Sequence, residues 1–170
     1  MRTSSAGSDL DLILIPASSV THVLSLEDQL AVWKTCHENL QPGGRLLVEA
    51  TMPNMASFAD SFGVPPRTPV EIDIDNIDEN DGTRLIRWKT TRYLSHEQRA
   101  QIRFIYEKYQ RGRAVESYID DFVCHVFFPR ELRLLFSHTG FEVEETLGDY
   151  RGRALKADSP VMIMIGRRST

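Results

Sequence analysis

The feature that most constrains the fold is the stretch 8–50, where two apolar runs flank an amphipathic segment. Asp11–Pro16 and Arg45–Ala50 are short and almost wholly apolar, as strands buried on both faces of a sheet are. Between them, Ser25–Asp28 has the pattern of a capping box that opens a helix, and Pro42–Gly44 predicts its end. Buried strands joined by a helix pair in parallel with a right-handed crossover, so the core is predicted to be α/β.

The predicted helix carries an apolar stripe. The side chains of Leu26, Leu30, Trp33 and Leu40 are expected to fall near one face of it. Trp33 is therefore predicted to lie in the core. The residues that precede the first strand, 1–8, are small and polar and are expected to be disordered.

From residue 69 to residue 128 the apolar residues recur with a period of two, which is typical of β-strands. Turn sequences at Asp81–Gly82 and Gln110–Gly112 separate these runs. The stretch 69–128 is therefore predicted to be an antiparallel β-meander with one apolar face. The Pro-rich segment before it reads as a loop with a short helix near Met55–Ser61.

Residues 129–167 predict a helix followed by two strands. Pro129 suits the first turn of a helix, and Gly140 can end it in a left-handed conformation. Phe141–Leu147 is the first of the two predicted strands. After a polar loop, Pro160–Gly166 is a second apolar run of strand length.

The order of these elements resembles the second half of class I S-adenosylmethionine-dependent methyltransferases. Leu40–Leu46 matches the Leu-x-Pro-Gly-Gly-x-Leu signature between the fourth and fifth strands of that family. The pattern from Thr139 to Gly166 resembles its closing sixth and seventh strands, of which the last runs antiparallel. The resemblance covers nearly all of the chain. It implies a partial Rossmann-like methyltransferase sheet of the fourth to seventh strands, with the β-meander inserted after the fifth, and a single partial domain over 1–170.

The family's cofactor needs a Gly-rich turn after a first strand and an acid that ends the second strand. The sequence has neither pattern, because Gly43 and Gly44 precede a strand instead of following one. The resemblance therefore implies that the first three strands lie upstream of Met1. S-adenosylmethionine is the implied cofactor, but a chain truncated in this way is expected to bind it weakly or not at all and to be inactive alone.

The resemblance also implies residues for a site. It would place Pro16, Ala17, Ser18 and Ser19 at the end of the fourth strand, beside the methionine part of the cofactor. Just beyond them, His22 could act as a general base. The alternatives are that the loop is only a strand end leading to a helix, and that His22 has a structural role.

Aromatic residues are the candidates for substrate binding. Trp88, Tyr106 and Tyr118 lie in the predicted meander and could line a pocket for a small molecule, although an aromatic-rich apolar face is more often simply the packed face of a sheet. Tyr150 lies in a Gly-Asp-Tyr segment that resembles a family loop near the mouth of the pocket. The His and Cys residues show no metal-ligand spacing, so no metal site is predicted.

Three functions remain open at this point. The first is a methyltransferase homologue that acts on a small molecule, with the substrate and the methylated atom undetermined. The second is a non-catalytic ligand- or protein-binding module derived from such an enzyme. The third is one half of a split enzyme, completed by a chain that carries the Gly-rich turn. Without its family neighbour, the strand Asp11–Pro16 would have a free edge, which predicts a homodimer or a complementary chain there.

Composition excludes several other partners. A net charge of −4 argues against a nucleic-acid ligand. The longest apolar runs are far shorter than the roughly 18 residues that a membrane span needs. The two cysteines, Cys36 and Cys124, are too few for a disulfide framework and are expected to be buried reduced thiols in a cytoplasmic protein.

Overall fold

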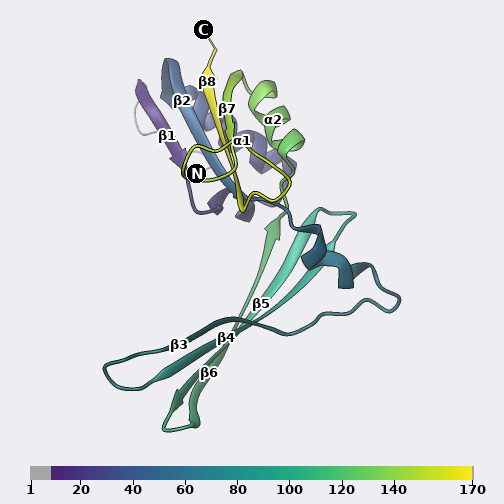
Figure 1. The fold of residues 1–170 in the computed structure, drawn as a ribbon. Helices are drawn as coiled ribbons and strands as arrows, with labels where there is room; N and C mark the ends of the chain where they lie inside the picture. The colour runs from purple at the N-terminus through teal and green to yellow at the C-terminus, as the bar shows by residue number, and fades with distance from the viewer. Residues whose placement is uncertain (1–8, 170) are drawn as a thin grey trace. The chain divides into compact units, whose positions relative to one another are not determined.

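The computed structural model describes residues 9–169, so the predicted disorder of residues 1–8 lies outside the described residues. The described residues form two compact units (Figure 1). The α/β unit comprises the chain up to Pro53 and from His125 onward, and the meander unit comprises Asn54–Cys124. The single domain over 1–170 stays a prediction.

The α/β unit has a four-stranded sheet of order β1-β2-β8-β7 (Figure 1). Strand β1 is parallel to β2, and β8 is antiparallel to both β2 and β7. This arrangement agrees with the antiparallel last strand that the resemblance implied. The elements of this unit are β1 (Leu10–Ile15), η1 (Ser19–His22), α1 (Leu26–Asn39), β2 (Leu40–Thr51), α2 (Pro129–His138), β7 (Phe141–Leu147) and β8 (Val161–Arg168).

Helix α1 begins as predicted but buries a different face. The Ser25 hydroxyl accepts a hydrogen bond from the Asp28 backbone N–H at 3.0 Å, which caps the helix. Leu26 is exposed, and Leu40 is the first residue of β2. The predicted stripe is therefore wrong at both ends. The buried face follows the helical spacing i, i+3, i+4, i+7 with Gln29, Val32, Trp33 and Cys36, and Asn39 continues it at the end of the helix.

The core of the α/β unit is organised around Trp33, which is fully buried as predicted. Its ring centroid lies 6.3 Å from that of Phe127 and 5.9 Å from that of Phe136, the latter in an edge-on arrangement. Gly166 of β8 lies against Phe136, where an added Cβ would come within 2.4 Å of the ring. The core thus ties α1 and α2 to the middle of the sheet.

Strand β1 differs from the prediction of burial on both faces. Ile15 is buried and Ile13 packs against the core, but Leu12 and Leu14 on the opposite face are exposed. Alternate side chains of a strand point to opposite faces, and only one face of β1 meets the core. Among the described residues β1 pairs with β2 alone, so it is an edge strand.

The meander unit confirms the predicted β-meander. Its sheet has the order β3-β4-β5-β6, and the 3-10 helix η2 lies where a short helix was expected. Arg111 and Gly112 have φ values of 50° and 75°, so both central residues of the β5–β6 turn are left-handed, as tight hairpin turns require. The elements are η2 (Met55–Phe62), β3 (Glu71–Ile77), β4 (Arg84–Leu94), β5 (Arg99–Gln110) and β6 (Arg113–His125).

Both cysteine thiols are reduced. Cys36 is buried as predicted, and burial raises the pKa of its thiol to about 11. Cys124 is half-buried, which corrects the prediction that it would be buried. Within residues 9–169, no helix has both the length and the apolar character needed to cross a membrane.

Candidate functional site

The carboxylate of Glu49, on β2, accepts hydrogen bonds from two loops of the α/β unit, one after β1 and one after β7. Its side chain lies near the carboxyl end of β2 and the residue is only 4% exposed. Its Oε2 accepts hydrogen bonds from the Ala17 backbone N–H at 2.6 Å and the Tyr150 hydroxyl at 2.8 Å. Its Oε1 accepts one from the Ser18 hydroxyl at 3.2 Å. These four residues form the Glu49 cluster, at the edge where open α/β sheets bind ligands.

The loop after β1 is held in an unusual conformation. Ala17 and Ser18 have φ values of 55° and 53°, and two successive non-glycine residues in the left-handed region cost free energy. Hydrogen bonds support the loop: the Ser18 and Thr51 hydroxyls lie 2.9 Å apart, and the Ser19 hydroxyl donates to the Pro16 carbonyl at 2.7 Å. Backbone strain of this kind clusters at functional sites. The predicted loop Pro16–Ser19 therefore lies at the Glu49 cluster, while its role in cofactor binding stays a prediction.

The loop after β7 brings Tyr150 to Glu49. Buried Asp149 accepts hydrogen bonds from the backbone N–H groups of Arg153 at 3.0 Å and Arg151 at 2.9 Å, and it pairs with the Arg153 guanidinium. The bond from the Arg153 backbone is the main cause that lowers the pKa of Asp149. The Tyr150 hydroxyl donates to Glu49, which raises the pKa of Tyr150 and keeps it a donor.

The three donors to Glu49 given above are neutral groups: a backbone amide and two hydroxyls. Buried carboxylates are usually paired with a cation, because burial of an uncompensated charge is costly. The Glu49 cluster is thus a pre-formed position in which a buried acid accepts hydrogen bonds from these three neutral donors. Chemically, it suits a cationic group that approaches the carboxyl ends of β1 and β2.

His22 lies at the end of η1 with its side chain exposed. It belongs to the segment that follows the strained loop, but it is not among the donors to Glu49 described above. A general base must reach the proton that it accepts. The predicted role of His22 as a base stays a prediction.

The structure separates the four aromatic residues predicted to bind substrate. Tyr106 and Tyr118 stack with ring centroids 4.4 Å apart. Trp88 faces Ile105 across the β4–β5 ladder, which places its side chain on the opposite face of the sheet from Tyr106. The Trp88 indole N–H donates to Glu107 at 2.7 Å. Tyr150 belongs to the α/β unit, so within one unit only Tyr106 and Tyr118 are brought together.

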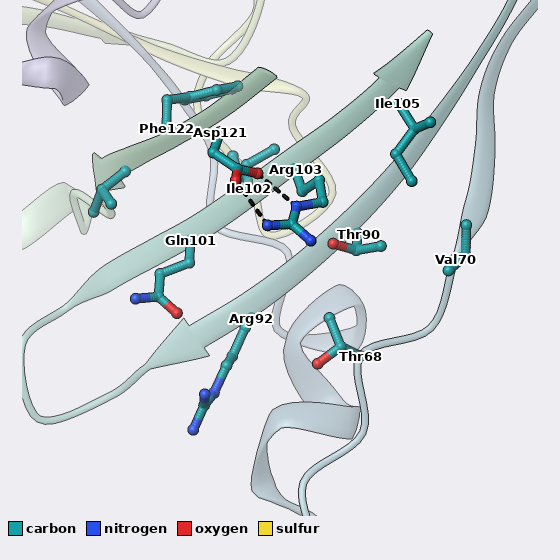
Figure 2. A pocket seen from close by; sticks show the side chains of 11 residues that line it. Thr68, Val70, Thr90, Arg92, Gln101, Ile102, Arg103, Ile105, Asp121 and Phe122 are labelled. Atoms are coloured by element: carbon teal, nitrogen blue, oxygen red, sulfur yellow. Dashed lines mark hydrogen bonds and ion pairs between the residues drawn. The ribbon is translucent and has the colours of Figure 1, made fainter. Parts of the chain in front are cut away.

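A cavity of about 660 Å³ lies in the meander unit (Figure 2). One wall is an ion pair, in which the Arg103 guanidinium donates two hydrogen bonds of 2.7 Å to the Asp121 carboxylate. Thr90, Arg92 and Gln101 add further polar groups to its lining. None of the four predicted aromatic residues lines this cavity. The sequence did not point to it, because polar residues that alternate along a strand resemble an ordinary solvated face.

Glu49 was also missed by sequence reasoning. A signal was present: it is an acid near the carboxyl end of an otherwise apolar run, Leu46–Ala50, where a solvated residue is not expected. The hydrogen bonds to Ala17 and Tyr150 join residues far apart in the chain, and no local pattern indicates them.

Comparisons with known proteins identify the fold. No family model and no curated protein matches the chain. The CcbJ methyltransferase from Streptomyces caelestis matches with a TM-score of 0.79 at 16% identity, covering 99% of this chain and 61% of that chain. DesVI from Streptomyces venezuelae matches with a TM-score of 0.70 at 20% identity, covering 99% of this chain and 62% of that chain. CalS10, an amino pentose methyltransferase from Micromonospora echinaspora, matches with a TM-score of 0.73 at 17% identity, covering 99% of this chain and 62% of that chain.

These likenesses show the fold. The chain has the Rossmann-like fold of class I S-adenosylmethionine-dependent methyltransferases, as the sequence resemblance implied. It spans about 61% of the length of the CcbJ methyltransferase.

Proposed function

We propose that this chain is the substrate-binding part of an S-adenosylmethionine-dependent methyltransferase that acts on a small molecule. The observation that carries the proposal is buried Glu49 with neutral donors at the carboxyl ends of β1 and β2. The sulfonium of S-adenosylmethionine is a cation, and so is a protonated amine acceptor. In support, CalS10 is an amino pentose methyltransferase whose structure has the cofactor bound, and MtfA is a glycopeptide N-methyltransferase.

Each part of the site has a role in this proposal. The loop Pro16–Ser19 lies beside the methionine part of the cofactor, and Glu49 attracts the cationic group. Tyr150 holds the Glu49 carboxylate in place by its hydrogen bond. Methyl transfer needs mainly in-line positioning of donor and acceptor. Where a proton is released, we assign its acceptance to Glu49 or His22. The raised pKa of Tyr150 keeps its hydroxyl a hydrogen-bond donor to Glu49.

The acceptor substrate is assigned to the meander unit. The cavity beside Arg103 offers polar groups for a hydroxylated molecule, whereas stacked Tyr106 and Tyr118 offer a second, flat apolar surface on the opposite face of the sheet. Trp88, on the opposite sheet face from Tyr106, is a separate candidate contact.

The cofactor requires a further segment. The edge of β1 has no neighbour other than β2 among the described residues, and exposed Leu12 and Leu14 flank it. We assign this edge to a strand that carries the Gly-rich turn; a second copy of the chain is the alternative. The chain alone is then inactive. Reduced Cys36 and Cys124 fit a reducing compartment such as the cytoplasm.

The test is a titration of the labelled chain with S-adenosylmethionine, followed by amide chemical shifts in NMR. We expect binding with a dissociation constant of about 1 mM or weaker. The shifts should be confined to the Glu49 cluster and absent in Glu49→Gln, whereas Glu142→Gln, which changes an exposed acid of β7, should behave as the wild type. Micromolar affinity would contradict the need for a further segment, and shifts elsewhere would contradict the site.

A further inference from the structure

The outer edge of β6 is unprotected. β6 is the last strand of its sheet, and every residue from 111 to 120 is exposed. Three large apolar side chains, Val115, Tyr118 and Ile119, are 53%, 55% and 58% exposed. The segment contains no Lys and no Pro, the residues that usually prevent an edge strand from pairing.

The opposite edge of the same sheet is different. β3 carries Glu71, Asp73 and Asp75 at alternate positions, so a second copy of β3 would bring acids against acids. β6 instead carries both signs, with Arg113 at its first position and Asp120 and Asp121 just past its middle. An antiparallel copy of β6 therefore brings opposite charges together.

Symmetry limits the possible registers. Suppose that a two-fold axis perpendicular to the sheet relates two antiparallel strands. The axis then passes through a residue and not between two residues, because directly opposite residues place their side chains on the same side of the sheet. We call this residue the centre of the register. A register centred on residue 116 places Glu116 against its own copy, and one centred on residue 120 does the same for Asp120. A register centred on residue 118 places Glu116 against Asp120. These registers are disfavoured by like charges.

The register centred on Ser117 avoids every such clash. It places Arg113 opposite Asp121 and Val115 opposite Ile119, and each pair occurs twice by symmetry. The Asp121 carboxylate already binds Arg103, but its side chain is half exposed and can accept a second guanidinium. The register centred on Ile119 also avoids a clash of acids, but it lacks the Arg113–Asp121 pairs.

From this self-complementarity we propose that two copies of the chain pair antiparallel through β6, with Ser117 on the two-fold axis. The two four-stranded sheets of the meander units then form one continuous sheet. The new ladder satisfies the open backbone edge of β6, and it covers part of Val115 and Ile119. This interface is independent of the function proposed above.

The first test is sedimentation of the full chain over a concentration series. We expect a dimer whose dissociation constant rises at least about tenfold in Arg113→Glu, since two attractive pairs become repulsive. Arg111→Glu is the matched control: it makes the same charge change in the turn just outside the register and should leave the constant within about twofold. A monomer at all concentrations, or equal effects of the two variants, would overturn the proposal.

The second test fixes the register by crosslinking. Paired residues of an antiparallel ladder lie within the Cα–Cα range of a disulfide. Ser117→Cys should therefore give an oxidised covalent dimer, while Ile119→Cys and the wild type, with Cys36 and Cys124, should not. Crosslinking of Ile119→Cys instead would refute the Ser117 register. A dimer dissociated by Ile13→Lys but insensitive to Arg113→Glu would place the interface at β1 and overturn the proposal.

Discussion

Each of the two units is stabilised internally by a different kind of interaction. Every large side chain buried to below 2% exposure belongs to the α/β unit, where Trp33, Phe127 and Phe136 pack together. The most buried apolar side chain of the meander unit, Ala100, is 4% exposed, and β6 has no buried residue before His125. Close-packed burial stabilises the first unit, and this source is much weaker in the second.

The meander unit depends instead on contacts near its surface. Arg84 donates to Asp75 at 2.7 Å from β4 to β3, and Arg103 and Asp121 link β5 to β6. The Arg87 guanidinium lies 4.4 Å from the centroid of the Phe104 ring. Exposed ion pairs and exposed cation–π contacts contribute little to stability, because water and salt screen them. The difference indicates that close-packed burial stabilises the α/β unit more than the meander unit, whose residues are more exposed.

The chain's two tryptophans divide between the units and allow a matched test. Trp33→Ala empties a fully buried aromatic site in the α/β unit, so we expect it to lower the free energy of unfolding by about 3–5 kcal/mol. Urea denaturation followed by circular dichroism measures the loss. A cost near 1 kcal/mol would mean that the core of this unit is not close-packed.

Trp88→Ala should cost less, about 1–2 kcal/mol, because Trp88 is only half-buried. Its loss also removes a hydrogen bond to Glu107, although that carboxylate still accepts one from the Tyr109 hydroxyl at 2.9 Å. The same denaturation experiment gives the comparison. Equal costs for the two tryptophans would contradict the contrast between the units.

The smallest expected effect is a difference in acid sensitivity. Folding lowers the pKa of Asp149, so its charged form stabilises the fold. This stabilisation is fully present above the pKa of the unfolded state, about 4, and it is lost as the pH falls through the lower pKa of the folded state. Asp149→Asn should therefore be less stable than the wild type at pH 7, with the gap closing below about pH 4. Asp121→Asn, which changes an exposed ion pair, should show a smaller gap. Thermal melts at both pH values measure it, and a gap at pH 3 as large as at pH 7 would argue against this origin.

Local patterns were enough to predict the order of elements. The apolar run at β1, the cap at Ser25 and the turn at Gly112 each depend on residues close in sequence. The burial of β1 was misjudged, because an unbroken apolar run does not reveal how many faces meet a neighbour. Leu12 and Leu14 are exposed for that reason.

The candidate site depended on register, which sequence does not give. A period of two places Trp88 with Ile86 on one face of β4, but only the pairing of Trp88 with Ile105 shows that Tyr106 lies on the other face. In the same way, the Glu49 cluster joins β2 to two loops that local sequence treats separately. Such contacts are fixed by topology and not by neighbouring residues.

The position of β8 also affects how the protein is made. β8 lies between β2 and β7 in the sheet, yet along the chain it follows both of them. During translation, β2 must therefore wait for its neighbour while the ribosome makes all of the meander unit, α2 and β7. At about 5–20 residues per second this delay lasts about 5–20 s, during which the edge of β2 that later pairs with β8 is open to association with other nascent chains. The native sheet therefore forms only if this edge of β2 is still unpaired when β8 emerges.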